Sequence, residues 1–181
     1  MRPTEILMDE HQIILQVIGA AEREARKMAE SGSADGAKVG KIIDFIRNFA
    51  DRCHHAKEEG QLFKMLERKG MPVESGPIAV MLQEHDMGRG YVQAVAEILE
   101  KGKTIGLQEV SVISENLSAY ADLLRGHIAK EDNVLYPMAD RMFSAADQHE
   151  LAEAFQRVEA EEIGAGVHEK YHGLAHELAG E

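Results

Sequence analysis

The 181-residue sequence predicts an all-α fold, an up-down-up-down four-helix bundle followed by short C-terminal helices. Hydrophobic residues recur at alternating three- and four-residue steps along four long segments, and breaks that contain glycine or proline separate these segments. The abundance of Ala, Leu, Ile, Glu, Lys and Met also favours helix, while strand signals are scarce. We expect one domain over residues 1–181, with the bundle in 4–142 and a helical extension in 144–181.

Each bundle helix is predicted from its own hydrophobic seam. The first begins after Thr4, and a stretch rich in glycine and serine, 31–40, separates it from the second. Pro72 and Pro77 break the chain before the third helix, and a short turn at 101–106 leads into the fourth. The expected ranges are 4–30, 38–69, 78–102 and, for the fourth seam, 113–138.

The end of the fourth helix and the extension carry signals of their own. Because proline lacks an N–H group, Pro137 should end or kink the fourth helix. Ser144 can cap a fifth helix that runs to about Glu162. The segment IGAG then separates it from a short final helix, Val167 to Leu178.

The composition narrows the range of partners. A formal net charge of −12 argues against nucleic acid or an anionic membrane, because both would repel an acidic surface, whereas small neutral or cationic partners fit. The single cysteine, Cys53, cannot form an internal disulfide, and the N-terminus has no apolar export signal. No apolar run approaches the ~20 residues that span a bilayer. We therefore expect a cytoplasmic protein in which Cys53 packs as a small buried hydrophobe.

The bundle sequence contains an internal repeat. HHAKEEGQLF at 54–63 aligns with HIAKEDNVLY at 127–136, an offset of 73 residues (127 − 54). The dipeptide EH at 10–11 aligns with EH at 84–85, an offset of 74 residues (84 − 10). The four helices are thus predicted to form two similar hairpins.

Polar residues of ligand type stand on the hydrophobic seams. An unpartnered polar group in a core costs on the order of 1–3 kcal/mol, so these residues need partners. Twice the pattern is His-x-x-x-Glu, which puts both side chains on one helix face, about 5–6 Å apart at Cβ. Four imidazoles and two carboxylates can hold two transition-metal ions, with two histidines on each ion, bridging glutamates, and one position open for O2, NO or peroxide. The predicted ligands are His11, His54, Glu58, His85, His127 and Glu131.

The second helix contains two overlapping His-x-x-x-Glu pairs, of which only one should face inwards. His54 and Glu58 continue the seam and match the repeat, whereas His55 lies about 100° further round an α-helix. His55 and Glu59 are then expected at the rim of the site or behind the ligands. Further residues that could hydrogen-bond a ligating histidine, with a solvated charge as the alternative, are Glu10, Glu84, Asp86 and Arg89.

These segments resemble a known family, the hemerythrin-like HHE cation-binding proteins. EHQIIL, CHHAKEEGQLF, QEHD and HIAKEDNVLYP are similar to its four ligand-bearing segments in the expected order, and HEKYHGLAHEL is similar to the tail of bacterial members. The resemblance implies a non-haem di-iron centre, oxo- or hydroxo-bridged, held by the same six residues. It also implies binding or sensing of O2, NO or iron, or detoxification of peroxide or NO, and leaves open whether the protein is an enzyme.

Two related functions also remain open. The animal oxygen carriers of this family use five histidines and two carboxylates, whereas this chain offers four and two in the matching places. That set resembles the branch that repairs iron–sulfur clusters, although the cysteine-bearing N-terminal segment of those proteins has no counterpart here; iron storage is a further alternative. Tyr120, on the fourth seam, is either a proton donor for peroxide chemistry or a core aromatic whose hydroxyl finds a partner.

A remote alternative is a zinc protease, because His168-Glu169-Lys170-Tyr171-His172 matches the pattern H-E-x-x-H. Nine residues follow His172, so a distant third ligand is not expected, and His176 does not have the metzincin spacing. Since the three histidines recur every four residues, an exposed helix face is the preferred interpretation.

Overall fold

The computed structural model describes residues 1–102, 104–164 and 166–180, apart from the side chains of residues 162 and 163. The described residues form an all-α fold, as predicted, and none of them lies in a strand. The two turns expected around residues 103 and 165 lie partly outside the described residues.

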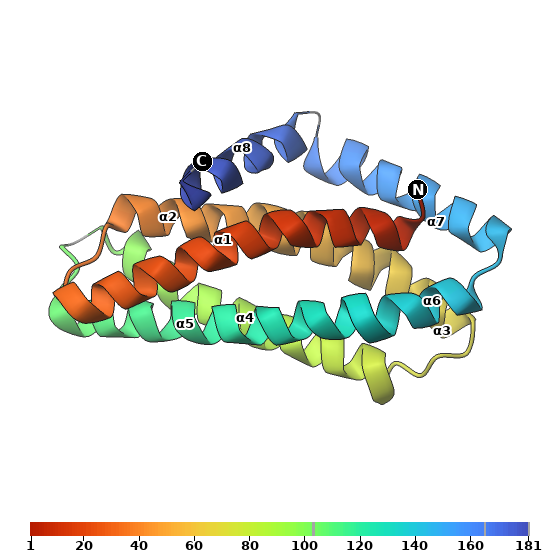
Figure 1. Cartoon of the computed structure of the whole chain (residues 1–181), viewed down its shortest axis with the longest axis horizontal. Coiled ribbons are helices and arrows are strands. Elements are labelled where there is room, and N and C mark those ends of the chain that lie inside the picture. The colour runs from red at the N-terminus through yellow and green to blue at the C-terminus, as the bar shows by residue number, and fades with distance from the viewer. Residues whose placement is uncertain (103, 165, 181) are drawn as a thin grey trace.

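Four long helical rods make up the body of the molecule and lie side by side (Figure 1). The second rod contains two π-helical segments between α2 and α3, and the fourth contains one between α5 and α6. The rods are, in chain order, α1 (Pro3–Ser31); α2 (Gly36–Phe45), η1 (Ile46–His55), η2 (Glu58–Leu62) and α3 (Phe63–Arg68); α4 (Gly76–Glu100); and α5 (Leu107–Lys130), η3 (Glu131–Leu135) and α6 (Tyr136–Met142).

The sequence predicts that Pro137 ends or kinks the fourth rod. The proline does not end the helix, because it lies in the first turn of α6, which continues to Met142. The π-helical turn η3 directly precedes α6. In such a turn each N–H group bonds to the carbonyl five residues back, which widens the helix. This widening makes room for the proline ring, so the rod continues.

The C-terminal extension forms an arm of α7 (Ala145–Arg157), η4 (Val158–Ile163) and α8 (Val167–Ala179). Ser144 caps α7 as predicted, since its hydroxyl accepts a hydrogen bond from the backbone N of Asp147 at 3.3 Å. The arm, blue in Figure 1, packs along α1 and α2. Tyr171 and Leu178 of α8 are buried, so the arm shares the core of the bundle.

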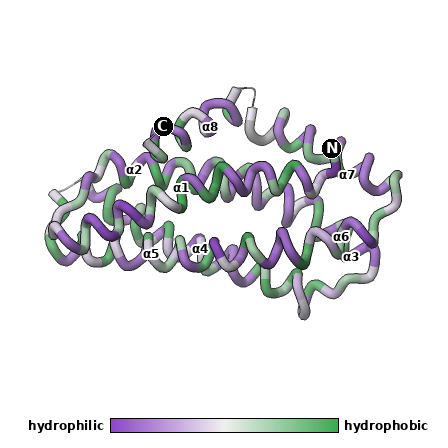
Figure 2. The backbone as a smooth tube through the Cα atoms, viewed as in Figure 1, coloured by the Kyte–Doolittle hydropathy of each residue, from purple (hydrophilic) through white to green (hydrophobic). Residues whose placement is uncertain are grey.

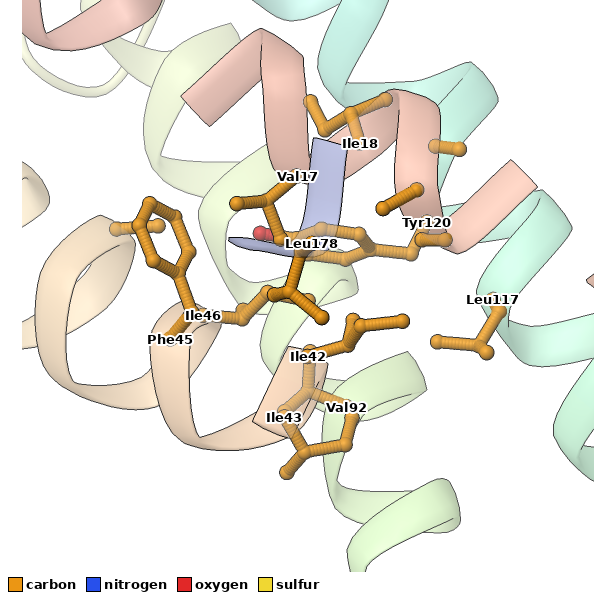
Figure 3. Close-up of a cluster of buried hydrophobic side chains, with 14 of the residues drawn as sticks. Val17, Ile18, Ile42, Ile43, Phe45, Ile46, Val92, Leu117, Tyr120 and Leu178 are labelled. Atoms are coloured by element: carbon orange, nitrogen blue, oxygen red, sulfur yellow. The ribbon is translucent and has the colours of Figure 1, made fainter. Parts of the chain in front are cut away.

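Two hydrophobic clusters fill the bundle. One contains Val17, Ile42 and Leu117, together with Leu178 from the arm (Figure 3). The other gathers around Leu7 at the start of α1. Along the rods, hydrophobic and hydrophilic residues alternate (Figure 2). Burial of one such aliphatic side chain contributes about 1.5–3 kcal/mol, and this packing forces the polar residues between the two clusters into the interior.

Candidate metal centre

Two pairs of histidines face each other inside the bundle. Nε2 of His11 on α1 lies 3.0 Å from Nε2 of His54 on η1. Nε2 of His85 on α4 lies 3.0 Å from Nε2 of His127 on α5. All four side chains are buried. Two nitrogens bonded to one ion at about 2.1 Å, at right angles to each other, would be about 3.0 Å apart. Each pair therefore has the spacing of two ligands of one metal ion.

The other ring nitrogen, Nδ1, of each of these four histidines forms a hydrogen bond with a carboxylate. Since a carboxylate can only accept, Nδ1–H is the donor, and Nε2 of the neutral ring carries the lone pair. The two lone pairs of each histidine pair then point at one another, an arrangement that a shared cation stabilises. The Nδ1–O distances are 2.7 Å for His11–Asp132 and His85–Glu59, and 2.9 Å for His54–Glu10 and His127–Glu84.

Glu58 and Glu131 connect the two histidine pairs. Each carboxylate lies near one histidine of either pair, as a ligand that bridges two ions must. The Oε–Nε2 distances are 3.7 Å to His54 and 3.4 Å to His85 for Glu58, and 3.3 Å to His11 and 3.1 Å to His127 for Glu131.

The same two carboxylates have unsatisfied oxygens. Oε2 of Glu58 and both side-chain oxygens of Glu131 accept no hydrogen bond from the described residues, and both side chains are 0% exposed. The imidazole nitrogens lie at ion-pair distance but without hydrogen-bond geometry. A buried acceptor left without a partner costs about 1–3 kcal/mol, and more when charged. Imidazole nitrogens and carboxylate oxygens suit transition metals, so the residues present fit a pair of metal ions.

His55 is also buried, directly beside the centre and behind the ring of His85, which agrees with the second of its two expected places and not with the rim. Its side chain is 5% exposed, and one ring nitrogen lies within 4.8 Å of ligand atoms of Glu58, His85 and His127. The expectation that only one of the two adjacent histidines faces inwards assumed α-helical geometry and is wrong. The rod is π-helical here, so each residue turns the helix by less than 100°, and both His54 and His55 are buried.

The ring of His55 stacks on that of His85, with 3.9 Å between centroids and 20° between planes. An imidazole lone pair lies in the ring plane, so two nearly parallel stacked rings cannot both direct a lone pair at one ion. The rings of His11 and His54 are tilted by 56°, and those of His85 and His127 by 54°. The tilted pairs therefore suit a shared ion, and His55 lies against the centre as a neighbour.

Three of the four further residues that could hydrogen-bond a ligating histidine lie in the outer layer of the centre. We use this term for the residues that hydrogen-bond or pair with the histidines and with the acceptors behind them. Glu10 and Glu84 hydrogen-bond to ligand-type histidines, as described above. Arg89 donates to Glu59 at 2.5 Å and thereby fixes another acceptor of the layer. Asp86 is 79% exposed at its side chain and forms an ion pair with Arg89 at 2.9 Å, so it lies outside the layer.

Sequence reasoning missed three residues of this layer. Lys57 and Lys130 form ion pairs with Glu10 and Glu84, and Asp132 accepts the hydrogen bond from His11. The internal repeat carried the signal, because Lys57 aligns with Lys130 in HHAKEE and HIAKED at the offset of 73. The twofold repeat thus extends beyond the six predicted ligands to the groups that orient and neutralise them.

Tyr136 and His55 are among the positions that break the symmetry of the centre. Tyr136 stands where the other half has Phe63, and its hydroxyl donates to Oε1 of Glu58 at 2.6 Å. His55 stands where the other half has Ile128. One half of the centre therefore has a tyrosine beside it, and the other has a second buried histidine.

The histidines of the centre have strongly shifted pKa values. Burial disfavours the charged ring of His11, but its hydrogen bond to Asp132 and the negative charge of the nearby Glu131 outweigh burial and raise its pKa to about 10. In the same way, the carboxylates around His85 outweigh burial and raise its pKa to about 9. For His55, burial and the nearby charge of His85 lower the pKa to about 3. Since a metal needs the deprotonated nitrogen, metal binding at neutral pH must displace protons.

A cavity of about 210 Å³ reaches the centre from one side. Gly88 lies in its wall, and under the repeat offset of 74 it stands where the other half has Ile14. A Cβ atom at Gly88 would lie 3.4 Å from the ring of Tyr120. The cavity is lined by the buried His55, His85 and His127, by Ile46, Gly88, Val92, Tyr120 and Leu124, and by Arg47, Asp51, Glu84, Arg89 and Gln93.

Tyr120 lies in the wall of this cavity and is 3% exposed. Its hydroxyl has no hydrogen-bond partner in the described part of the chain, contrary to the expectation for a core aromatic. Figure 3 shows the ring among Val17, Ile46 and other core residues. Burial raises the pKa of the hydroxyl, so the group stays protonated and available as a donor.

The arm brings its histidines against the bundle. Nε2 of His168 lies 3.0 Å from Nε2 of His172, and both rings pack edge-on against Phe49. These two side chains are half-buried, which differs from the exposed face that was expected, whereas His176 and Glu169 are exposed. The glutamate of the H-E-x-x-H pattern thus lies on the outer side of α8.

Cys53 is buried as predicted, with its thiol 3.5 Å from Oε1 of Glu159. Burial raises the pKa of this thiol, which keeps it in the unreactive protonated form. Glu10, Glu159 and His168 gather around it, but Lys57 pairs with both glutamates and supplies the cation there.

Comparisons with known proteins agree with this geometry. A family model described as the hemerythrin HHE cation-binding domain matches residues 2–139. Curated relatives include the uncharacterized protein Rv1995 of Mycobacterium tuberculosis and the uncharacterized protein Mb2018 of Mycobacterium bovis. Each is 22% identical over 160 residues, which cover 88% of this chain and 62% of the relative.

No solved structure matches the chain. The chain spans about three fifths of the length of its curated relatives, 62%. No helix of the described residues combines the length and apolar character that a membrane span requires. The family model matches residues 2–139, which is most of the chain, and this range includes all six predicted ligands. The chain therefore belongs to the hemerythrin HHE cation-binding domain family.

Proposed function

We propose that this protein is a non-haem di-iron protein that binds O2, NO or peroxide at an open position on its metal pair. The two ions would be held by the six predicted residues, with an oxo or hydroxo bridge. The observation that carries the proposal is the pair of buried carboxylates, Glu58 and Glu131, whose three unpartnered oxygens face two pairs of imidazole nitrogens.

Two ions, and not one, account best for this arrangement. There are two separate Nε2–Nε2 pairs, and each carboxylate lies near one histidine of both. Two divalent ions carry four positive charges, which two glutamates alone do not balance. The outer carboxylates add negative charge, and Lys57, Lys130 and Arg89 compensate part of it. Buried and half-buried side chains around the centre would thus balance the charge of the two ions, and none of the six proposed ligands is exposed.

Iron would supply one-electron chemistry and a Lewis-acid position for a small oxygen- or nitrogen-containing ligand. The residues of this chain supply the surroundings. Glu84 and Glu59 orient His127 and His85 through their Nδ1–H groups, which keeps both Nε2 lone pairs directed inwards. Ile46 and Leu124 line the approach and limit water near these rings.

The cavity supports access from the His85–His127 side. It is large enough for a diatomic molecule or peroxide, and both histidines lie in its wall. On the other side, Tyr136 donates to Glu58 and fixes that carboxylate in place. We therefore propose that small ligands reach the centre on the side of His85, in the cytoplasm, and that catalysis, sensing and carriage share this entry.

Metal analysis and spectroscopy test the proposal. The purified protein should contain about two iron ions per chain, and its visible spectrum should change on reduction and on exposure to O2, peroxide or NO. His127→Ala should remove the metal, while His149→Ala, on the exposed surface of α7, should retain it. Metal confined to the arm histidines would refute the centre. Iron that leaves readily and shows no spectral response to the three ligands would favour iron storage.

A further inference from the structure

The cavity beside the centre is larger than a diatomic ligand or peroxide requires. Its volume is about 210 Å³. An apolar cavity of about 150 Å³ accepts benzene, with six non-hydrogen atoms, and one water molecule takes about 30 Å³ in the liquid. The cavity therefore has room for a molecule of about eight non-hydrogen atoms, several times the size of O2.

One residue of the cavity wall, Gly88, differs between the two halves of the repeat. At the position of Gly88 the other half has Ile14, which is 2% exposed and fills its surroundings. A Cβ atom added at Gly88 would touch the ring of Tyr120 at 3.4 Å and the side chain of Leu124 at 3.6 Å, so the glycine allows both to pack close to α4 at the cavity wall.

The walls select a neutral ligand with an apolar body. Ile46, Val92 and Leu124 offer carbon surface. The two arginines of the lining already have acidic partners: Arg47 lies 3.3 Å from Glu100, and Arg89 binds Asp51 and Glu59. An anionic ligand would have to compete with these ion pairs.

One polar group in the wall is available for such a ligand. The hydroxyl of Tyr120 is buried, protonated, and accepts or donates no hydrogen bond in the described part of the chain. A buried hydroxyl without a partner is unfavourable, so a ligand oxygen that accepts its hydrogen is stabilised there. The ligand should therefore carry an oxygen acceptor as well as a carbon body.

We propose that this cavity binds small organic hydroperoxides, neutral molecules with a carbon body of about four to six atoms and a terminal –OOH group. Tyr120 donates a hydrogen bond to a ligand oxygen, and the body packs against Val92 and Leu124. The choice of a hydroperoxide among oxygen-bearing molecules rests on the proposed function of the metal centre. The binding of a small neutral organic molecule does not, because it depends on the cavity alone.

Ligand-observed NMR on the metal-free full chain tests the site with two probes. tert-Butanol has a carbon body and one oxygen, and benzene has a carbon body of similar size without an acceptor oxygen. Both should bind to the native protein. Tyr120→Phe should weaken tert-butanol binding by about two- to tenfold and leave benzene binding unchanged, because only one probe uses the hydroxyl.

Cavity-filling variants provide the controls. Val92→Phe should abolish binding of both probes, while Val80→Phe, on the exposed side of the same helix, should preserve it. Should Val92→Phe fail to fold, Gly88→Ala replaces it, since alanine favours helix and its Cβ makes an ordinary contact at 3.4 Å. Gly88→Ala should weaken the binding of both tert-butanol and benzene.

Binding of neither probe to the native protein would overturn the proposal, as would equal effects of Tyr120→Phe on both. Metal analysis separates this result from the fate of the proposed function. Val92→Phe should still bind two metal ions, whereas His127→Ala should lose metal and still bind benzene. A protein that binds benzene but no iron would refute the metal centre and keep the cavity site.

Discussion

Metal should stabilise the folded protein, because the centre buries carboxylate oxygens that only a cation satisfies. Three such oxygens, on Glu58 and Glu131, lack a hydrogen-bond partner. At about 1–3 kcal/mol each, they raise the free energy of the metal-free fold by about 3–9 kcal/mol. A domain of this size shifts its Tm by about 2–4 °C per kcal/mol, so even the lower value corresponds to about 6–12 °C.

The assay is thermal unfolding followed by circular dichroism, with and without Fe²⁺ under anaerobic conditions. The native protein should unfold at least about 6 °C higher when the free metal saturates the site, because binding to the folded state alone shifts the equilibrium. His127→Ala should show no such shift, since it removes one nitrogen of the His85 pair. His149→Ala, whose side chain is 77% exposed, is the matched control and should respond like the native protein.

The reasoning would be refuted by an equal metal-induced shift in His127→Ala and in the native protein. That result would mean that the stabilising ion binds elsewhere, for example between the arm histidines His168 and His172. The double replacement of these two arm residues by alanine would then lose the shift.

Three further outcomes follow from the centre and its outer layer. Elemental analysis should show that His54→Ala loses bound metal and that His55→Ala retains it, because the ring of His55 is stacked on His85 and not directed at the shared position. The reverse result would show that the ligands are assigned wrongly. Glu84→Gln should weaken metal binding about 10- to 100-fold in a chelator competition, whereas Glu115→Gln on the exposed face of α5 should not. The metal-free protein should also lose stability progressively between about pH 6.5 and pH 10 in urea unfolding. The pKa of His11 rises from 6.5 to about 10 on folding, so its contribution is complete below pH 6.5 and disappears as pH passes through 10; a flat profile would contradict this.

The sequence predicts the helices well because each is specified locally. Seams at three- and four-residue steps and caps such as Ser144 depend only on neighbouring residues. The expected first helix, 4–30, and the observed α1, Pro3–Ser31, differ by one residue at either end. Pro137 is the exception. Its effect depends on the π-helical turn before it, and hydrophobic periodicity does not predict such a turn.

The gathering of the six ligand-type residues was predictable because the repeat shows their pattern twice. The position of His55 was not, since its inward direction follows from π-helical geometry in η1. The cavity was not predictable either. A glycine on a seam does not indicate which side chains will pack against it, and here Tyr120 and Leu124 lie against Gly88 in the wall of the cavity.

Positions that match between the two halves of the repeat and positions that differ have different consequences for function. Matched positions such as Lys57 and Lys130 give both halves the same means of holding an ion. The unmatched positions make the two sides unequal: Gly88 lies in the wall of the cavity beside His85, and the equivalent position in the other half is the buried Ile14. A ligand that enters through this cavity meets the His85–His127 pair first. The choice of ligand should therefore respond to substitutions at the few unmatched positions, while metal binding responds to the matched ones.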